Sequence, residues 1–300
     1  MTPAPFSRRR FLALSASVGF AGAVAACGGG STGKGSSGAT DIQGTLQIVK
    51  RFPDAGLVKG RVRLPISLGD TSGVLGSDKL KNLPTTLNAQ VVDAETGDVV
   101  IEKLTADRFG DDLSVPYWPF TFTIDRDSGI FLLKVDEAPD SDCSFQIEDR
   151  KNVVTPVMGE PLPPFDTPTT DNSRGVDPIC TRQGSPCPFH GSTLTEALKS
   201  GKPVLYLIGT PAYCQTGTCT PALDALISAS QALGDSVAIV HADVYKDKSA
   251  TEAAPAVKAY KLAYEPVLYI TDAKGILVDR LDAVFDVKEM NAVLANAGIS

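Results

Sequence analysis

The stretch that decides the fold of the second half of this chain is residues 203–221, Pro-Val-Leu-Tyr-Leu-Ile-Gly-Thr-Pro-Ala-Tyr-Cys-Gln-Thr-Gly-Thr-Cys-Thr-Pro. Its first part, 204–208, is a short and continuously apolar run, which is typical of a buried strand. Apolar residues then recur at helical spacing over 222–233 and predict a helix there. Two thiols, Cys214 and Cys219, therefore lie between a buried strand and the start of a helix.

The start of this helix determines what the two thiols can do. Pro221 suits the first helical position, so we expect Thr220 to be the N-cap. The dipole and the unpaired N–H groups at a helix N-terminus favour a thiolate, which is the reactive form of cysteine. Residues five apart in a continuous helix are separated by roughly 8 Å, which exceeds the reach of a disulfide. A Cys214–Cys219 disulfide therefore requires a turn between the two residues, and Gly217 can adopt the positive φ of such a turn.

A second motif, Glu-Pro-Val-Leu-Tyr-Ile-Thr-Asp at 265–272, completes a resemblance to a known family. Together with the strand, the Tyr-Cys pair at 213–214 and the helix that follows, it resembles a thioredoxin-like domain, over about residues 188–300. The whole is similar to extracytoplasmic thioredoxin-like lipoproteins of bacteria. The resemblance implies an α/β fold with strands separated by helices. It also implies a cis-proline at Pro266 that faces Cys214 and Cys219.

The function that this resemblance implies is thiol–disulfide exchange. Cys214 would attack as a thiolate, Cys219 would resolve the mixed disulfide, and Pro266 would hold the substrate backbone beside the sulfurs. The expected partners are thiols and disulfides of envelope or secreted proteins. We expect a Cys214–Cys219 disulfide in the oxidised protein.

Two other functions remain open from the sequence. The spacing is C-x4-C where C-x2-C is usual, and Ile208 stands where thioredoxin has a buried carboxylate; both features favour a non-catalytic envelope binding module with a structural disulfide. A Sco-like copper protein would need a histidine beside the thiolates. Of the two histidines, His241 is expected to be a packed imidazole at a strand end and His190 a surface residue. The sequence thus predicts no metal ion and no cofactor.

The N-terminal residues resemble a targeting signal. Residues 7–12, Ser-Arg-Arg-Arg-Phe-Leu, resemble a twin-arginine export signal. Residues 24–27, Val-Ala-Ala-Cys, resemble a lipobox, so 1–27 is expected to be a signal peptide with lipidation at Cys27. The Gly- and Ser-rich residues 28–43 would form a flexible tether. This predicts a protein of the cell envelope, held by lipid on the outer face of the cytoplasmic membrane.

Charge and cysteine count limit the remaining possibilities. The net charge of −7 argues against nucleic-acid binding, because phosphate contact needs an excess of Lys and Arg. An exported protein meets an oxidising compartment in which disulfides persist. We expect Cys180–Cys187 as a second disulfide and Cys143 unpaired and buried, although the sequence leaves open that Cys143 joins Cys180 or Cys187.

The first half of the chain predicts only strands. Between residues 44 and 158, short segments with alternating apolar residues follow one another at roughly ten-residue spacing, which favours an immunoglobulin-like β-sandwich. Trp118, the only tryptophan, is expected to pack in its core. Residues 159–187 are rich in proline and predict a semi-extended linker. The predicted fold class is therefore an all-β sandwich domain followed by an α/β thioredoxin-like domain at 188–300.

Overall fold

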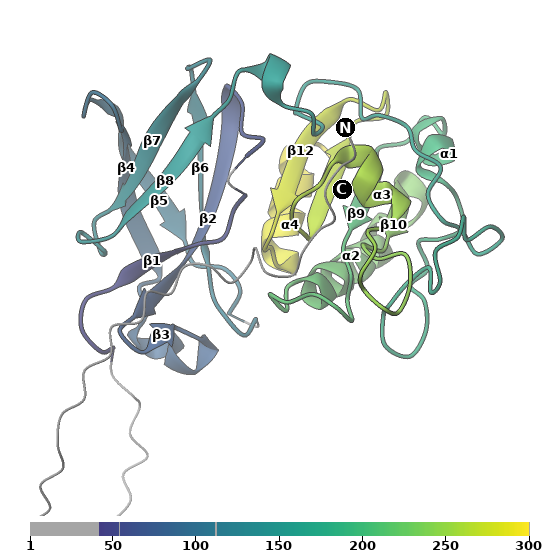
Figure 1. Cartoon of the computed structure of the whole chain (residues 1–300), viewed down its shortest axis with the longest axis horizontal. Coiled ribbons are helices and arrows are strands. Elements are labelled where there is room, and N and C mark those ends of the chain that lie inside the picture. The colour runs from purple at the N-terminus through teal and green to yellow at the C-terminus, as the bar shows by residue number, and fades with distance from the viewer. Residues whose placement is uncertain (1–41, 54, 112, 300) are drawn as a thin grey trace, which may run out of the picture. The chain divides into compact units, whose positions relative to one another are not determined.

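The computed structural model describes residues 42–53, 55–111 and 113–299, which belong to a single compact unit. Figure 1 shows strands without α-helices in its purple and teal part, and strands mixed with helices in its green and yellow part. Strands make up 32% of the structure and helices 19%. The expected signal peptide, the lipidation at Cys27 and most of the tether lie outside the described residues. Among the described residues, no helix is long and apolar enough to cross a membrane.

Two antiparallel sheets form the first part of the chain. In one sheet the long strand β2 pairs with the three others, and its members are β1 (Gln47–Lys50), β2 (Gly60–Asp70), β3 (Gly73–Val74) and β6 (Trp118–Ile124). The other has the order β5-β4-β7-β8, with β4 (Thr86–Asp93), β5 (Val99–Asp107), β7 (Gly129–Val135) and β8 (Asp142–Ile147). Two short 3-10 helices, η2 (Ser77–Asn82) and η3 (Arg150–Asn152), complete this part.

The period of two in these strands explains their packing. In β6 and β8, buried residues alternate with residues that are exposed or partly exposed, as expected for strands with one face on a core. Buried side chains from both sheets belong to one apolar cluster. Trp118 is fully buried in this cluster, which confirms its predicted packing role, and Cys143 on β8 is buried there as well.

A mixed four-stranded sheet forms the second part, in the order β10-β9-β11-β12. Strand β10 (Ala238–Ala242) is parallel to β9 (Val204–Ile208), whereas β11 (Val267–Thr271) is antiparallel to both β9 and β12 (Leu277–Asp282). The helices are α1 (Leu194–Leu198), α2 (Cys219–Leu233), the 3-10 helix η4 (Gly234–Ser236), α3 (Pro255–Tyr260) and α4 (Val287–Asn296).

Separate apolar clusters cover the two faces of this sheet. Leu205 and Leu207 of β9 belong to the cluster that includes α2 and α4. The alternate residues Val204, Tyr206 and Ile208 belong to the cluster that includes α1 and α3. Burial on both faces is why β9 reads as a continuous apolar run in the sequence.

These proportions overturn the predicted fold class. We expected an α/β thioredoxin-like domain at 188–300 beside an all-β domain, but the described chain is mostly β and has few helices. Two of the helices are short: α1 has five residues and follows its cap Thr193, and α3 has six residues and begins at Pro255. A proline is readily accepted at the first helical position, where its missing N–H has no intrahelical partner to lose.

The proline-rich segment 159–187 lies against the sheet over its first residues. The Gly159 N–H donates to the carbonyl of Leu277 at 2.8 Å, and the Leu162 N–H donates to that of Gly275 at 2.9 Å. Pro161 forms an isolated bridge with Ile276. Proline is accepted here because β12 is an edge strand.

A buried ion pair connects the first part to the second. Arg63 on β2 donates to both carboxylate oxygens of Glu289 on α4 at 2.7 Å, and to the carbonyls of Asp282 at 3.0 Å and Val284 at 2.6 Å. Both side chains of the pair are less than a tenth exposed. Tyr117 donates to the same carboxylate at 2.7 Å. Burial disfavours the charge of Arg63, but the Glu289 carboxylate outweighs it, so the pKa of Arg63 is raised.

We therefore expect Arg63→Met to lower the free energy of unfolding by about 3–5 kcal/mol, because the Glu289 charge would stay buried without its partner. Urea denaturation of the variant and the wild type measures this difference. The control is Lys59→Met, since Lys59 and its partners Asp125 and Asp127 are mostly exposed and its loss should leave the midpoint unchanged. Equal midpoints for both variants would contradict the importance of the buried pair.

Candidate functional site

Cys214 and Cys219, and also Cys180 and Cys187, lie near the end of the mixed sheet at which β9 and β10 finish. In the strand register, Ala242 at the end of β10 and Val267 at the start of β11 both face Ile208, the last residue of β9. The loops that follow β9 and β10 and the loop that precedes β11 therefore meet at this end of the sheet. The first of these loops carries Cys214 and leads into α2.

The segment between Cys214 and Cys219 is a turn, as a close approach of the two residues requires. Gly217 has a φ of +69°, and its N–H donates to the carbonyl of Cys214 at 3.3 Å. The prediction of Thr220 as the N-cap is wrong, because α2 begins at Cys219 with Thr218 as its cap. The proline at 221 permits this earlier start, since N–H groups in the first helical turn have no intrahelical acceptor.

Cys214 is a half-buried thiol at the N-terminus of α2. Its sulfur lies 3.3 Å from the Cys219 backbone N–H, which donates to it, and 3.3 Å from the Thr216 hydroxyl. These contacts lower the pKa of Cys214 to about 4; the hydrogen bond from the Cys219 thiol is the largest cause, and partial burial opposes it. Cys214 is therefore a thiolate at neutral pH.

Cys219 has the opposite character. Its side chain is 1% exposed, and its sulfur donates to Oε2 of Glu265 at 3.5 Å. The hydrogen bond to Cys214 and burial raise the pKa of Cys219. The single proton of this thiol thus has two acceptors within reach, the Cys214 sulfur and the Glu265 carboxylate.

Glu265 is the residue that the sequence did not identify. Burial is the main reason that its pKa is raised to about 8, and the negative charge on Cys214 adds to the effect. Its Oε2 also accepts the Thr210 N–H at 2.9 Å. Ile208 stands where the resemblance expected a carboxylate and packs in the α1/α3 cluster instead. The available sequence signal was a carboxylate directly before Pro266.

Pro266 and Gly209 complete the surroundings of the thiol pair. The Glu265–Pro266 peptide bond is cis. A Cβ atom on Gly209 would lie 3.4 Å from Pro266 Cβ and 3.6 Å from Cys219 Sγ. Gly209 therefore lies against both the proline and the buried thiol.

The first part of the chain contributes one charge to this region. Arg51, the residue after β1, has its pKa lowered by burial, and the Cys214 thiolate opposes this shift. The guanidinium is thus close enough to Cys214 for the two opposite charges to favour each other.

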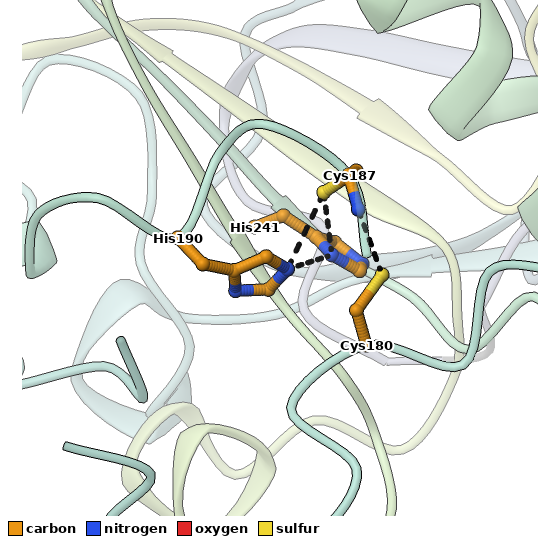
Figure 2. A group of neighbouring side chains, drawn as sticks. All are labelled: Cys180, Cys187, His190 and His241. Carbon is orange, nitrogen blue, oxygen red and sulfur yellow. Dashed lines mark hydrogen bonds between the residues drawn. The ribbon is translucent and has the colours of Figure 1, made fainter. Parts of the chain in front are cut away.

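A second cluster brings together Cys180, Cys187, His190 and His241 (Figure 2). The first three come from the segment before α1, and His241 comes from β10. Each offers a sulfur or ring nitrogen, and these four atoms all lie within 4.8 Å of one another. All four side chains are at most 5% exposed.

Neither predicted disulfide is present in the structure: Cys180, Cys187, Cys214 and Cys219 are all thiols. Cys180 and Cys187 have surroundings that the sequence did not predict. Their sulfurs converge on two imidazoles instead of forming a pair set apart from other polar groups. Cys143 lies in the other core, with Trp118.

His190 is not the surface residue that we predicted. The backbone N–H of His241 donates to the Phe189 carbonyl at 3.1 Å, so residue 189 lies along the unpaired edge of strand β10. The next residue, His190, points into the interior, where its side chain is buried. The two imidazoles lie 3.3 Å apart, from His190 Nε2 to His241 Nδ1. The copper alternative needed a histidine beside Cys214 and Cys219, but the metal-type donor grouped with that pair is Glu265.

No family model and no curated protein matches this chain.

The lowered pKa of Cys214 predicts an unusual pH dependence of alkylation in the reduced protein. Only the thiolate reacts, so the rate of Cys214 modification by iodoacetamide should stay nearly constant from pH 8 to pH 5 and fall as the pH approaches 4. Mass spectrometry of peptides from timed reactions measures this rate. Glutathione is the control, since its rate falls steadily below pH 8. A similar steady fall for Cys214 would contradict the assignment of a stabilised thiolate.

Proposed function

We propose that this protein carries out thiol–disulfide exchange, with Cys214 as the nucleophile and Cys219 as the resolving thiol. One observation supports this most strongly: a half-exposed thiolate at a helix N-terminus lies beside a buried thiol that contacts a carboxylate. This arrangement separates the roles of the two sulfurs, because one is ionised and accessible while the other keeps its proton.

The reaction proceeds in two exchanges. The Cys214 thiolate attacks one sulfur of a substrate disulfide, forming a mixed disulfide and releasing the other substrate sulfur as a thiolate, which takes a proton from water. Cys219 then loses its proton and attacks the Cys214 sulfur. The second substrate thiolate leaves, and the Cys214–Cys219 disulfide remains. Two electrons pass from the cysteine pair to the substrate disulfide, and the reverse sequence oxidises a substrate dithiol.

Glu265 accepts the proton of Cys219 in the second exchange. Once Cys214 is part of a mixed disulfide, its sulfur no longer carries the charge that attracts this proton, and Glu265 Oε2 is the remaining acceptor at 3.5 Å. A base with a pKa near the working pH is effective in such a transfer. The pKa of Glu265 is about 8 beside the Cys214 thiolate and falls once that charge is lost.

The low pKa of Cys214 favours the oxidising direction. Stabilising the thiolate stabilises the dithiol form, which raises the reduction potential of the pair. Combined with the export signal and lipobox that the sequence predicts, this points to a lipid-anchored protein that supplies disulfides to other proteins of the envelope. A reduction potential above about −200 mV for the pair supports this direction, and one below about −300 mV indicates a structural disulfide.

Substitution of the two cysteines should block the exchange reaction at different steps. Cys214→Ser should abolish exchange with a model disulfide such as oxidised glutathione. Cys219→Ser should still attack but accumulate a stable mixed disulfide at Cys214, visible by intact mass. Cys143→Ala is the control and should keep full activity, because Cys143 lies in the other core. Undiminished exchange by Cys214→Ser would refute the proposed function.

Glu265→Gln should slow the second exchange selectively. In wild-type protein carrying a mixed disulfide of Cys214 with a chromogenic thiol, release of that thiol should accelerate as the pH rises and level off by about pH 8, because loss of the Cys214 charge lowers the pKa of Glu265 below the value of about 8 that it has beside the thiolate. The variant should release it roughly 100-fold more slowly at pH 8. Glu252→Gln, at an exposed glutamate, serves as the control. Unchanged release by Glu265→Gln would exclude Glu265 as the proton acceptor.

A further inference from the structure

The cluster of Cys180, Cys187, His190 and His241 has no role in the exchange reaction, yet it gathers four ligand-type atoms in the interior (Figure 2). We propose that these residues form a structural Zn²⁺ site. The proposal goes beyond thiol–disulfide exchange and does not depend on it.

The distances fit tetrahedral coordination. With Zn–N bonds near 2.05 Å and Zn–S bonds near 2.3 Å, ligand atoms at tetrahedral angles are separated by about 3.4 Å for two nitrogens and about 3.6 Å for sulfur and nitrogen. The His190 Nε2–His241 Nδ1 distance is 3.3 Å. Cys187 Sγ lies 3.3 Å from the former nitrogen and 3.4 Å from the latter. The distances between these three ligand atoms therefore already match the edges of such a tetrahedron.

Cys180 supplies the fourth position. Its sulfur lies within 4.8 Å of the other three atoms and accepts the Cys187 backbone N–H at 3.5 Å. A backbone N–H that donates to a cysteine sulfur favours the thiolate that a metal ion requires. Two thiolates and two neutral imidazoles give a neutral site with Zn²⁺, which suits a buried position.

The ring orientation of His241 agrees with a role as a ligand. Its Nε2 lies 3.0 Å from the Gly209 carbonyl, to which it donates, so Nδ1 is left as the nitrogen without a proton and faces the cluster. Ligand histidines commonly donate their second N–H to a carbonyl in this way. Strand alternation also contributes, because His241 is two residues after Ile239, which packs in the α2/α4 cluster together with Cys180 and Cys187.

The chemistry of the donors selects the metal. A tetrahedral set of two sulfurs and two nitrogens is typical of zinc, and a site closed by four protein ligands is typical of a structural role. Burial of all four side chains leaves no open position for a substrate. The ion would hold the segment 180–190 against β10. Through Gly209 it would also support the loop that carries Cys214.

The test measures metal content in full-length protein purified under reducing conditions. Inductively coupled plasma mass spectrometry should find one zinc per chain in the wild type. Cys187→Ser and His190→Gln should each weaken zinc binding by more than roughly 100-fold in competition with a chromogenic chelator, since loss of a supporting residue alone costs 10–100-fold. The matched control is Cys214→Ser/Cys219→Ser, which removes the other cysteine pair and should retain one zinc.

A second measurement does not depend on the variants folding. Wild-type protein stripped of metal and loaded with Co²⁺ should give the absorption of a tetrahedral site with thiolate ligands. Any of three results would overturn the proposal: reduced wild-type protein that binds no zinc, zinc that is lost with Cys214 and Cys219 but kept in Cys187→Ser, or isolated protein that carries copper and no zinc when both were supplied. The double cysteine variant also separates the two proposals, because it lacks exchange activity but keeps the zinc site.

Discussion

The hydrogen bond from His241 to the carbonyl of Gly209 is the contact on which both cysteine groups depend. It joins His241, which lies within β10, to Gly209, the residue that follows the last paired residue of β9. On one side it orients an imidazole toward Cys187 and His190. On the other side, it fixes Gly209, which lies against Cys219 and Pro266. A second link runs alongside, because Thr181 donates its N–H and hydroxyl to Asp243 and lies 3.1 Å from the Thr210 hydroxyl. Strand register therefore sets the position of both groups.

Within the proposed exchange site, reactivity comes from an unequal division of one proton. Cys214 is ionised because backbone and side-chain donors surround it at a helix start, while Cys219 keeps its proton because it is buried. Glu265 has the intermediate affinity that lets it take this proton once the nucleophile has reacted. Three neighbouring groups with well-separated proton affinities are a common property of acid–base sites.

Local sequence patterns predicted the parts of this structure that depend on residue type and on neighbours close in the sequence. The apolar run of β9, the turn at Gly217 and the burial of Trp118 follow from periodicity and residue type. The fold class was wrong because short helices could not be told from longer ones before their caps were known. The pairing of His190 with His241 could not be predicted, since it depends on a segment lying along a strand edge 51 residues further on. Glu265 was missed because a glutamate before a proline does not by itself indicate contact with the buried thiol of Cys219.

The buried contact between Arg63 and Glu289 limits how this chain can be divided. A fragment starting after residue 158 would keep Glu289 and lose its guanidinium, and one starting after residue 162 would also lose the backbone that pairs with β12. A fragment ending there would leave Arg63 without the carboxylate and the two carbonyls to which it donates. The strand-only part is therefore not an interchangeable module attached to an independent second part. The chain would have to be expressed as a whole for both charges of this buried pair to keep their partners.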